Sequence, residues 1–146
     1  MTPVAYAAYN HVVTTTTSKD RVLILLYEGA VRFVQSARDG MREKKIAAKG
    51  ENISRTLKIL NELEFALDHE IGGDLADNLA SLYQYMRRRL TWANRKNDES
   101  ALEEVEGLLI QLKDAFDQAA LMAKSGTPVD VNLPEGPAMR RISFAV

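Results

Sequence analysis

Residues 78–94 of the chain read NLASLYQYMRRRLTWAN. Apolar residues recur here at positions i, i+3, i+4, i+7, i+11 and i+14, from Leu79 to Ala93, which predicts one buried stripe on an α-helix. Tyr85 and Trp92 lie off this stripe, one heptad apart, and therefore face in similar directions. A helix with a second, aromatic strip either lies centrally in a bundle or presents that strip to another molecule.

The same helical period extends along most of the chain. It predicts four amphipathic helices, over about residues 19–45, 51–70, 74–96 and 100–124. Helices of this length with short connections favour antiparallel neighbours, so the sequence predicts an all-α fold, an antiparallel four-helix bundle. We expect a single bundle domain over residues 1–124, which begins with a polar N-terminal arm.

Turn and cap residues mark the expected helix ends. Ser18 and Asp74 are placed to cap the first and third helices. Gly50 and the Gly72-Gly73 pair are expected in the connections on either side of the second helix. From Ser125 onward the helical pattern stops among prolines and glycines, which predicts an irregular C-terminal tail over residues 125–146.

Composition excludes several classes of function. The 146 residues include 19 basic and 20 acidic residues, giving a net charge of −1, and there is no cysteine. A balanced charge gives no electrostatic basis for binding nucleic acid, and the longest apolar run, residues 22–27, is far too short to cross a membrane. The N-terminus lacks the pattern of a signal peptide. We therefore expect a soluble, cytoplasmic protein with no nucleic-acid partner and no membrane insertion.

The sequence offers no convincing catalytic or metal site. The two histidines, His11 and His69, lie in the arm and at the end of the second predicted helix. Neither belongs to a Glu-x-x-His motif, which di-iron bundles require. We therefore expect no catalytic residue, no metal and no cofactor, and interpret the protein as a non-enzyme.

Two charged clusters have structural explanations. The acidic residues Glu99, Glu103, Glu104 and Glu106 avoid the apolar stripe of their helix, so we interpret them as a solvated face rather than as acid–base groups. The run Arg87–Arg89 cannot form one anion cradle, because consecutive helical residues point about 100° apart. We expect these arginines to pair with acids on the second and fourth helices or to cover apolar surface.

The aromatic residues divide into two groups. Burial in the core is the more usual role for residues at helical spacing, here Tyr27, Phe33, Tyr83, Met86 and Phe116. An interface role is more plausible for residues outside the main stripes, because tyrosine and tryptophan are enriched where one end of the ring is apolar and the other wet. These are Tyr6, Tyr9, Tyr85 and Trp92.

The chain resembles the flagellar export chaperones, the FliS family, over about four-fifths of its length. The shared features are the arm pair Tyr6-x-x-Tyr9, the run LYEGA at residues 26–30, LYxYM at 82–86, RRL at 88–90, Ala93-Asn94 and Asn97-Asp98. The chain departs from the family at Lys19, where a proline is frequent, and in the tail from Ser125, which has no counterpart.

The resemblance implies a cytosolic, non-enzymatic chaperone of flagellar type III secretion. Its client is the disordered C-terminal segment of flagellin, which it holds to prevent premature polymerisation. A further contact delivers the chaperone–client complex to a component of the export gate. A bundle alone would equally suit a regulatory or adaptor protein that binds another amphipathic segment, and a weak homodimer also stays open.

The resemblance and the aromatic pattern together suggest a partner-binding surface formed by the arm and by lines on the first and third helices. We predict that the arm covers part of a groove until the client displaces it. The predicted partner-binding residues are Tyr6, Tyr9, Val13, Tyr27, Tyr83, Tyr85, Met86, Leu90, Ala93 and Asn94.

Overall fold

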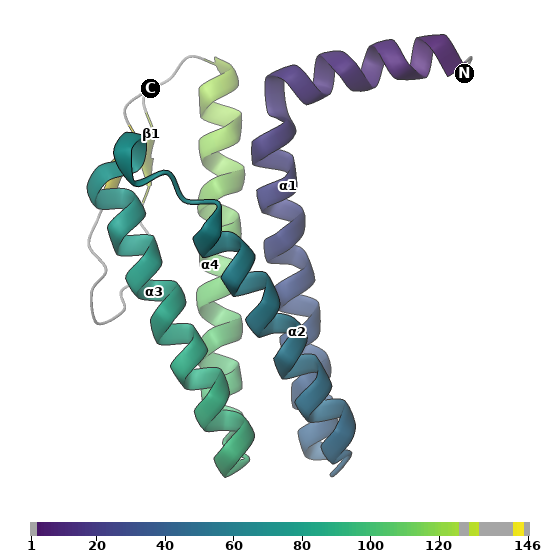
Figure 1. Ribbon diagram of the computed structural model, residues 1–146, viewed down its shortest axis with the longest axis vertical. Coiled ribbons are helices and arrows are strands. Elements are labelled where there is room, and N and C mark those ends of the chain that lie inside the picture. Colours follow the sequence, from purple (N-terminus) through teal and green to yellow (C-terminus); the bar gives the residue numbers. More distant parts are fainter. Residues whose placement is uncertain (1–2, 126–128, 132–141, 145–146) are drawn as a thin grey trace.

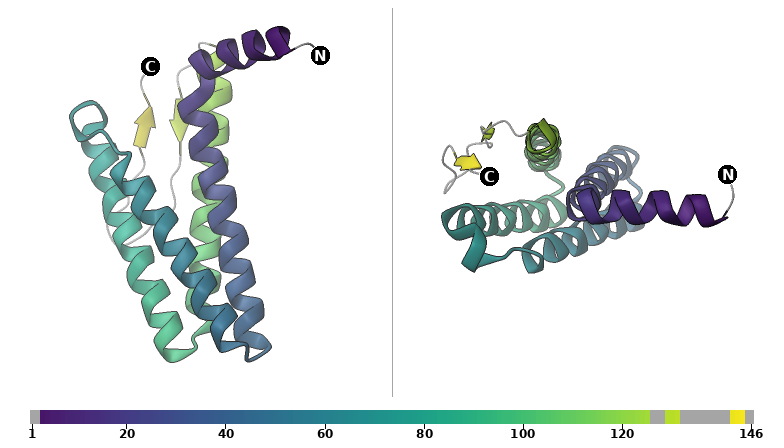
Figure 2. Two further views of the ribbon diagram at one scale, coloured as in Figure 1. Left: turned by 45° about the vertical axis from the view of Figure 1, so that its right-hand side comes forward. Right: turned by 90° about the horizontal axis from the view of Figure 1, so that it is seen from above.

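Four helices dominate the computed structural model of the protein, which describes residues 3–125, 129–131 and 142–144, with side chains described over residues 19–123. They are α1 (Pro3–Arg42), α2 (Ile46–Phe65), α3 (His69–Lys96) and α4 (Glu99–Ser125). Helices α1 and α3 each pack against both α2 and α4. Consecutive helices are joined by short turns and run in opposite directions (Figures 1 and 2). The predicted all-α four-helix bundle is confirmed.

The core is formed by apolar side chains from all four helices. Helix α3 buries every residue of its predicted stripe, together with Ala76 and Ala80. Each fully buried leucine contributes about 1.5–3 kcal/mol relative to an exposed one. The largest side chains that are fully buried are Tyr27, Val34, Ile53, Leu60, Leu63, Leu82, Tyr83, Met86, Leu90, Leu102, Leu109 and Leu112.

Helix α1 is longer than the sequence pattern indicated. It begins at Pro3, so the predicted polar arm is helical from that residue and Ser18 is not a cap. No glycine or proline separates Pro3 from Gly29, and Pro3 suits a first helical position. The N-terminal part of α1 bends and runs away from the bundle (Figure 1).

The turn between α1 and α2 depends on a close approach at Gly40. Lys44 has a positive φ of 58° and reverses the chain, so α2 begins at Ile46 and Gly50 lies inside it rather than in the predicted turn. A Cβ on Gly40 would lie 2.9 Å from the backbone nitrogen of Lys49. Only glycine lets the two backbones pack this closely.

Gly40→Ala is therefore expected to lower the free energy of unfolding by about 1–3 kcal/mol, the usual cost of overpacking. Gly107 supplies the matched control, because a Cβ there meets nothing within 4 Å. Gly107→Ala should raise stability by about 0.5–1 kcal/mol, since alanine is the better helix former. Urea unfolding of both variants measures the difference; equal effects of the same sign would contradict the close-approach explanation.

Helix α3 begins before the glycine pair rather than after it. The carboxylate of Asp68 accepts hydrogen bonds from the backbone N–H groups of Glu70 and Ile71, both at 3.1 Å, and so caps the helix. The predicted cap at Asp74 is wrong. The pair nevertheless interrupts the helix, because Gly73 has φ 50° and ψ −124°. A single turn of helix is thereby set apart from the long rod that follows.

The turn between α3 and α4 lies where the sequence predicted it. Asn97 ends α3 in the left-handed conformation. Asp98 accepts hydrogen bonds from the backbone N–H groups of Ser100 and Ala101 at the start of α4. The hydroxyl of Ser100 also donates to this carboxylate and holds the pKa of Asp98 below its ordinary value.

The C-terminal tail, predicted to be irregular, contains two short strands. These are β1 (Val129–Val131) and β2 (Ile142–Phe144), which pair antiparallel with Asp130 opposite Ser143. Strand β1 lies against α4. Both strands contain β-branched residues, and β2 also contains a phenylalanine, which favour an extended backbone.

Candidate functional site

An apolar groove of about 250 Å³ lies at the end of the bundle formed by the α2–α3 turn. All four helices contribute to it. The lining residues are Leu23 of α1, Leu63, Ala66 and Leu67 at the end of α2, Asp68 in the turn, Ile71, Gly72, Leu75, Ala76, Leu79 and Tyr83 of α3, and Phe116 of α4. The carboxylate of Asp68 is occupied in capping α3, so the groove presents an apolar surface to a ligand.

Large apolar side chains stand exposed beside this groove. Ile71, one of its lining residues, is 87% exposed, and Phe65, which precedes the lining residue Ala66, is 93% exposed. An exposed apolar side chain that lines a groove, as Ile71 does, marks a binding site more often than scattered single residues do. The fold therefore leaves one end of the bundle open for an apolar partner.

Two of the groove's lining residues, Tyr83 and Phe116, pack against the buried ring of Tyr27. The hydroxyl groups of Tyr27 and Tyr83 are hydrogen-bonded to each other, and the ring of Tyr27 stacks on Phe116 with centroids 5.6 Å apart. Burial and the nearby carboxylate of Glu64 raise the pKa of Tyr83 to about 12. Burial also raises the pKa of Tyr27 well above its ordinary value.

The tyrosine pair should make stability depend on alkaline pH. Because both pKa values are higher in the folded state than the value of about 10 in the unfolded chain, the stabilisation is complete below pH 10. For Tyr83 it is lost as the pH rises from about 10 through about 12, by up to about 1.4 kcal/mol per pH unit, and the raised pKa of Tyr27 adds to the loss above pH 10.

The double variant Tyr27→Phe/Tyr83→Phe removes both hydroxyls and should be nearly neutral at pH 8, since no buried polar group is left unpaired. Urea unfolding at pH 8 and pH 11 should show a smaller alkaline loss for this variant than for the native chain. Equal alkaline losses would show that the pair does not titrate as described.

Half of the predicted partner-binding residues lie inside the bundle. The side chains of Tyr27, Tyr83, Met86, Leu90 and Ala93 are at most 1% exposed. Apart from Tyr83, which lines the groove, they have no surface that a partner can contact in this conformation. The core role that the helical spacing favours is confirmed for the tyrosines and methionine among them.

The other predicted binding residues differ in accessibility. Tyr85 is half-buried, and its hydroxyl donates a hydrogen bond of 2.8 Å to Glu104 of α4. Asn94 is exposed, while its backbone carbonyl accepts a hydrogen bond from Lys49. The remaining three, Tyr6, Tyr9 and Val13, belong to the N-terminal part of α1, where the structure describes the backbone but not the side chains.

The arginine run behaves as the helical geometry predicted. Arg87 pairs with Glu64 of α2 at 2.7 Å, and Arg89 pairs with Glu104 of α4 at 2.7 Å. Arg88, between them, points elsewhere and lies over the ring of Tyr85. The expectation that these arginines pair with acids on the second and fourth helices is confirmed for Arg87 and Arg89.

The acidic cluster of α4 is less solvated than predicted. Arg38 of α1 forms ion pairs with Glu99, Glu103 and Glu106, and the side chain of Glu106 is only 13% exposed. Arg42 also pairs with Glu99. These carboxylates therefore hold α1 against α4.

The described residues contain no cluster of three or more His, Cys, Asp or Glu side chains that could hold a metal ion. His69 lies at the start of α3, half-exposed, with its Nδ1 2.8 Å from a carboxylate oxygen of Asp77. Within the described part of the chain, no helix is long and apolar enough to span a membrane.

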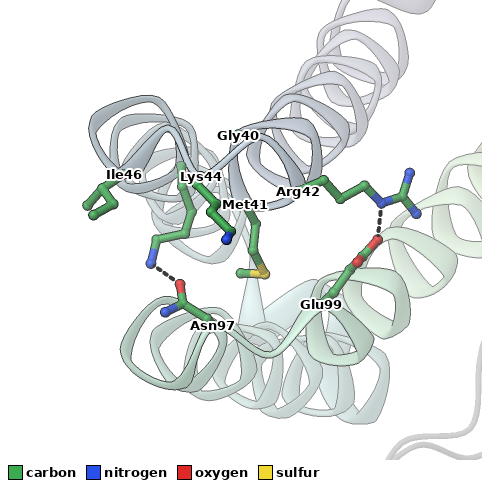
Figure 3. A pocket seen from close by; sticks show the side chains of 8 residues that line it. Gly40, Met41, Arg42, Lys44, Ile46, Asn97 and Glu99 are labelled. Atoms are coloured by element: carbon green, nitrogen blue, oxygen red, sulfur yellow. Dashed lines mark hydrogen bonds and ion pairs between the residues drawn. The ribbon is translucent and has the colours of Figure 1, made fainter.

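A second hollow, of about 470 Å³, lies at the opposite end of the bundle between the α1–α2 and α3–α4 turns. Met41 points into it, and the Arg42–Glu99 ion pair borders it (Figure 3). Lys49 is buried and donates to the side-chain oxygen of Asn97 at 2.6 Å. Paired polar side chains thus form part of the lining of this hollow, beside the apolar side chains of Met41 and Ile46.

Of the residues that line the open groove, the sequence pattern placed only Tyr83 in the predicted binding surface. Leu63 and Leu67 belong to the apolar stripe of the predicted second helix, and nothing in that stripe distinguishes a residue at the end of the core from one inside it. Ile71 carried a usable signal, because a large apolar residue stands alone between two acidic residues and a glycine pair.

Together, the four-helix fold and the apolar groove are those of a helical-bundle binding protein. The sequence profile of the family described as "Flagellar protein FliS" matches residues 1–123. The chain therefore belongs to the FliS family, which consists of chaperones and not of enzymes.

Relatives from several bacteria support this family membership. The flagellar secretion chaperone FliS of Salmonella typhimurium is 42% identical over 102 residues, which cover 69% of this chain and 76% of that protein. The flagellar secretion chaperone FliS of Bacillus subtilis is 34% identical over 114 residues, covering 78% of this chain and 84% of that protein. The flagellar secretion chaperone FliSB of Pseudomonas aeruginosa is 42% identical over 97 residues, which cover 66% of this chain and 77% of that protein.

Proposed function

We propose that this protein is a cytoplasmic chaperone that binds the disordered C-terminal segment of flagellin, prevents its premature polymerisation and assists its secretion. The observation that carries the proposal is the apolar groove at the α2–α3 end, with Ile71 exposed beside it. Membership of the FliS family and the names of the relatives support it.

The chemistry of groove and client is complementary. A disordered amphipathic segment exposes apolar side chains that would otherwise pair with other copies of itself. Laying these side chains into a groove of a bundle covers them without any chemical step. The segment loses conformational freedom when it binds, at a cost of about 2–5 kcal/mol or more, which the buried apolar area has to exceed.

The remaining predicted binding residues are proposed as further contact positions. Tyr85 and Asn94 on α3, and Tyr6, Tyr9 and Val13 on the N-terminal part of α1, are proposed to contact the client beyond the groove. The buried residues Tyr27, Tyr83, Met86, Leu90 and Ala93 shape the surface from beneath. A separate contact with a component of the export gate would then deliver the complex.

The direct experiment mixes the protein with intact flagellin and with flagellin that lacks roughly its last 40 residues, a length able to wrap a bundle. Size-exclusion chromatography should show co-elution with the intact client alone. Co-elution with both forms would reject the C-terminal segment as the bound element. Co-elution with neither would favour the alternative, a bundle that serves as an adaptor for another amphipathic segment.

A further inference from the structure

A second surface of α3 combines exposed cations with the single tryptophan of the chain. Gln84, Arg87, Arg88, Thr91, Trp92 and Arg95 line a shallow hollow of about 580 Å³ on the outside of the bundle. We call these residues the basic face. It shares no lining residue with the apolar groove, whose α3 residues end at Tyr83.

Two arginines of the basic face lack an acidic partner. Arg87 is neutralised by Glu64. Arg88 and Arg95, by contrast, have no carboxylate within ion-pairing distance among the described residues. Their guanidinium groups lie over aromatic rings instead, Arg88 at 5.9 Å from the centroid of Tyr85 and Arg95 at 5.5 Å from that of Trp92. The rings hold the two cations in place while leaving their N–H groups free to bind anions.

Trp92 is positioned as an anchor between these cations. Its side chain is 40% exposed, and its indole N–H donates to Asp98 at 3.1 Å, which fixes the ring. Lys96 lies over the same ring at 5.7 Å. Tryptophan and arginine are the residue types that most often dominate protein–protein binding energy.

We propose that the basic face docks an acidic peptide segment of a partner protein. Charge complementarity selects the partner, because the face offers two uncompensated guanidinium groups and each can bind a carboxylate through two parallel hydrogen bonds. The exposed side of the Trp92 ring would accept an apolar side chain between the acids. This inference does not depend on the proposed function, since it concerns a different surface.

The spacing of the two arginines restricts the peptide. Arg88 and Arg95 are seven residues apart, or about 10 Å along the helix axis at 1.5 Å per residue. An extended peptide advances about 3.3 Å per residue, and alternate residues share a face. Two acidic residues that lie two to four positions apart on one face of the peptide are therefore separated by about the distance between Arg88 and Arg95.

Trp92 provides the readout, because as the only tryptophan it reports on the basic face alone. The probe is a synthetic peptide of about ten residues, with acids at alternate positions and one central phenylalanine, titrated into the full chain. We expect a saturable change in tryptophan fluorescence, and the binding that it reports should weaken with added salt. The same peptide with Gln and Asn in place of the acids should give no saturation.

The double variant Arg88→Glu/Arg95→Glu should bind the acidic peptide at least tenfold more weakly by calorimetry. Arg32→Glu is the matched control, since Arg32 is an exposed arginine of α1, a helix that packs against α2 and α4, and it should retain native affinity. Equal affinity of the double variant and the control would overturn the proposal. Tighter binding of a single-stranded RNA oligonucleotide than of the peptide would also overturn it.

Discussion

Leu90→Asp is expected to abolish the folded state at neutral pH. Leu90 is fully buried in the middle of α3. Loss of a buried leucine side chain alone costs about 2–5 kcal/mol, and a buried polar group without a partner adds about 1–3 kcal/mol. The sum is comparable to the whole stability of a small domain, about 5–15 kcal/mol. Circular dichroism should show a largely unfolded chain at 25 °C.

Thr91→Asp is the matched control for this variant, because Thr91 is the next residue of the same helix and is exposed. It should melt within a few degrees of the native protein, as surface substitutions usually do. A folded Leu90→Asp variant would show that α3 does not bury this stripe. Loss of partner binding by Leu90→Asp would report unfolding and not contact.

The second large effect is expected at the groove. Ile71→Asp should weaken binding of the flagellin C-terminal segment about 100-fold while leaving the melting temperature almost unchanged. The variant removes an apolar contact worth about 1.5–3 kcal/mol and places a carboxylate against apolar client side chains. Because a factor of 100 corresponds to about 2.7 kcal/mol, calorimetry can measure the loss directly.

Ile46→Asp controls for the change of residue type. Ile46 is also an exposed isoleucine, 77% accessible, in the first turn of a helix, but it lies at the opposite end of the bundle. This variant should bind the client like the native protein. If both variants lose affinity equally, general electrostatic repulsion explains the result; if neither does, the groove is not the binding site.

The architecture was predictable because the helical period of apolar residues can be recognised in a single sequence. The stripe from Leu79 to Ala93 predicts the buried face of the helix. The directions in which successive side chains leave a helix are enough to assign Arg87 and Arg89 to different neighbouring helices. The start of α3 was not predictable from the same pattern. Glycine pairs usually end helices, whereas here Asp68 caps a turn that precedes the pair.

The candidate site was predictable only in part. An apolar stripe looks the same whether it faces the core or a partner, so Met86 and Leu90 were predicted as binding residues although the fold places them inside. The groove depends on where α2 stops and how far α1 and α4 extend past it. Those lengths follow from tertiary packing, which overrides local signals at helix ends.

The left-handed residue Gly73 has a consequence for how the bundle end moves. It separates the short turn that carries Ile71 from the rod that carries the core residues of α3. That turn is held by the Asp68 cap and by few buried side chains, so its amides should exchange with solvent faster than those of the rod. Movement of this first turn of α3 would change the width of the groove, so that side chains of different size could bind while the remaining helices stay fixed.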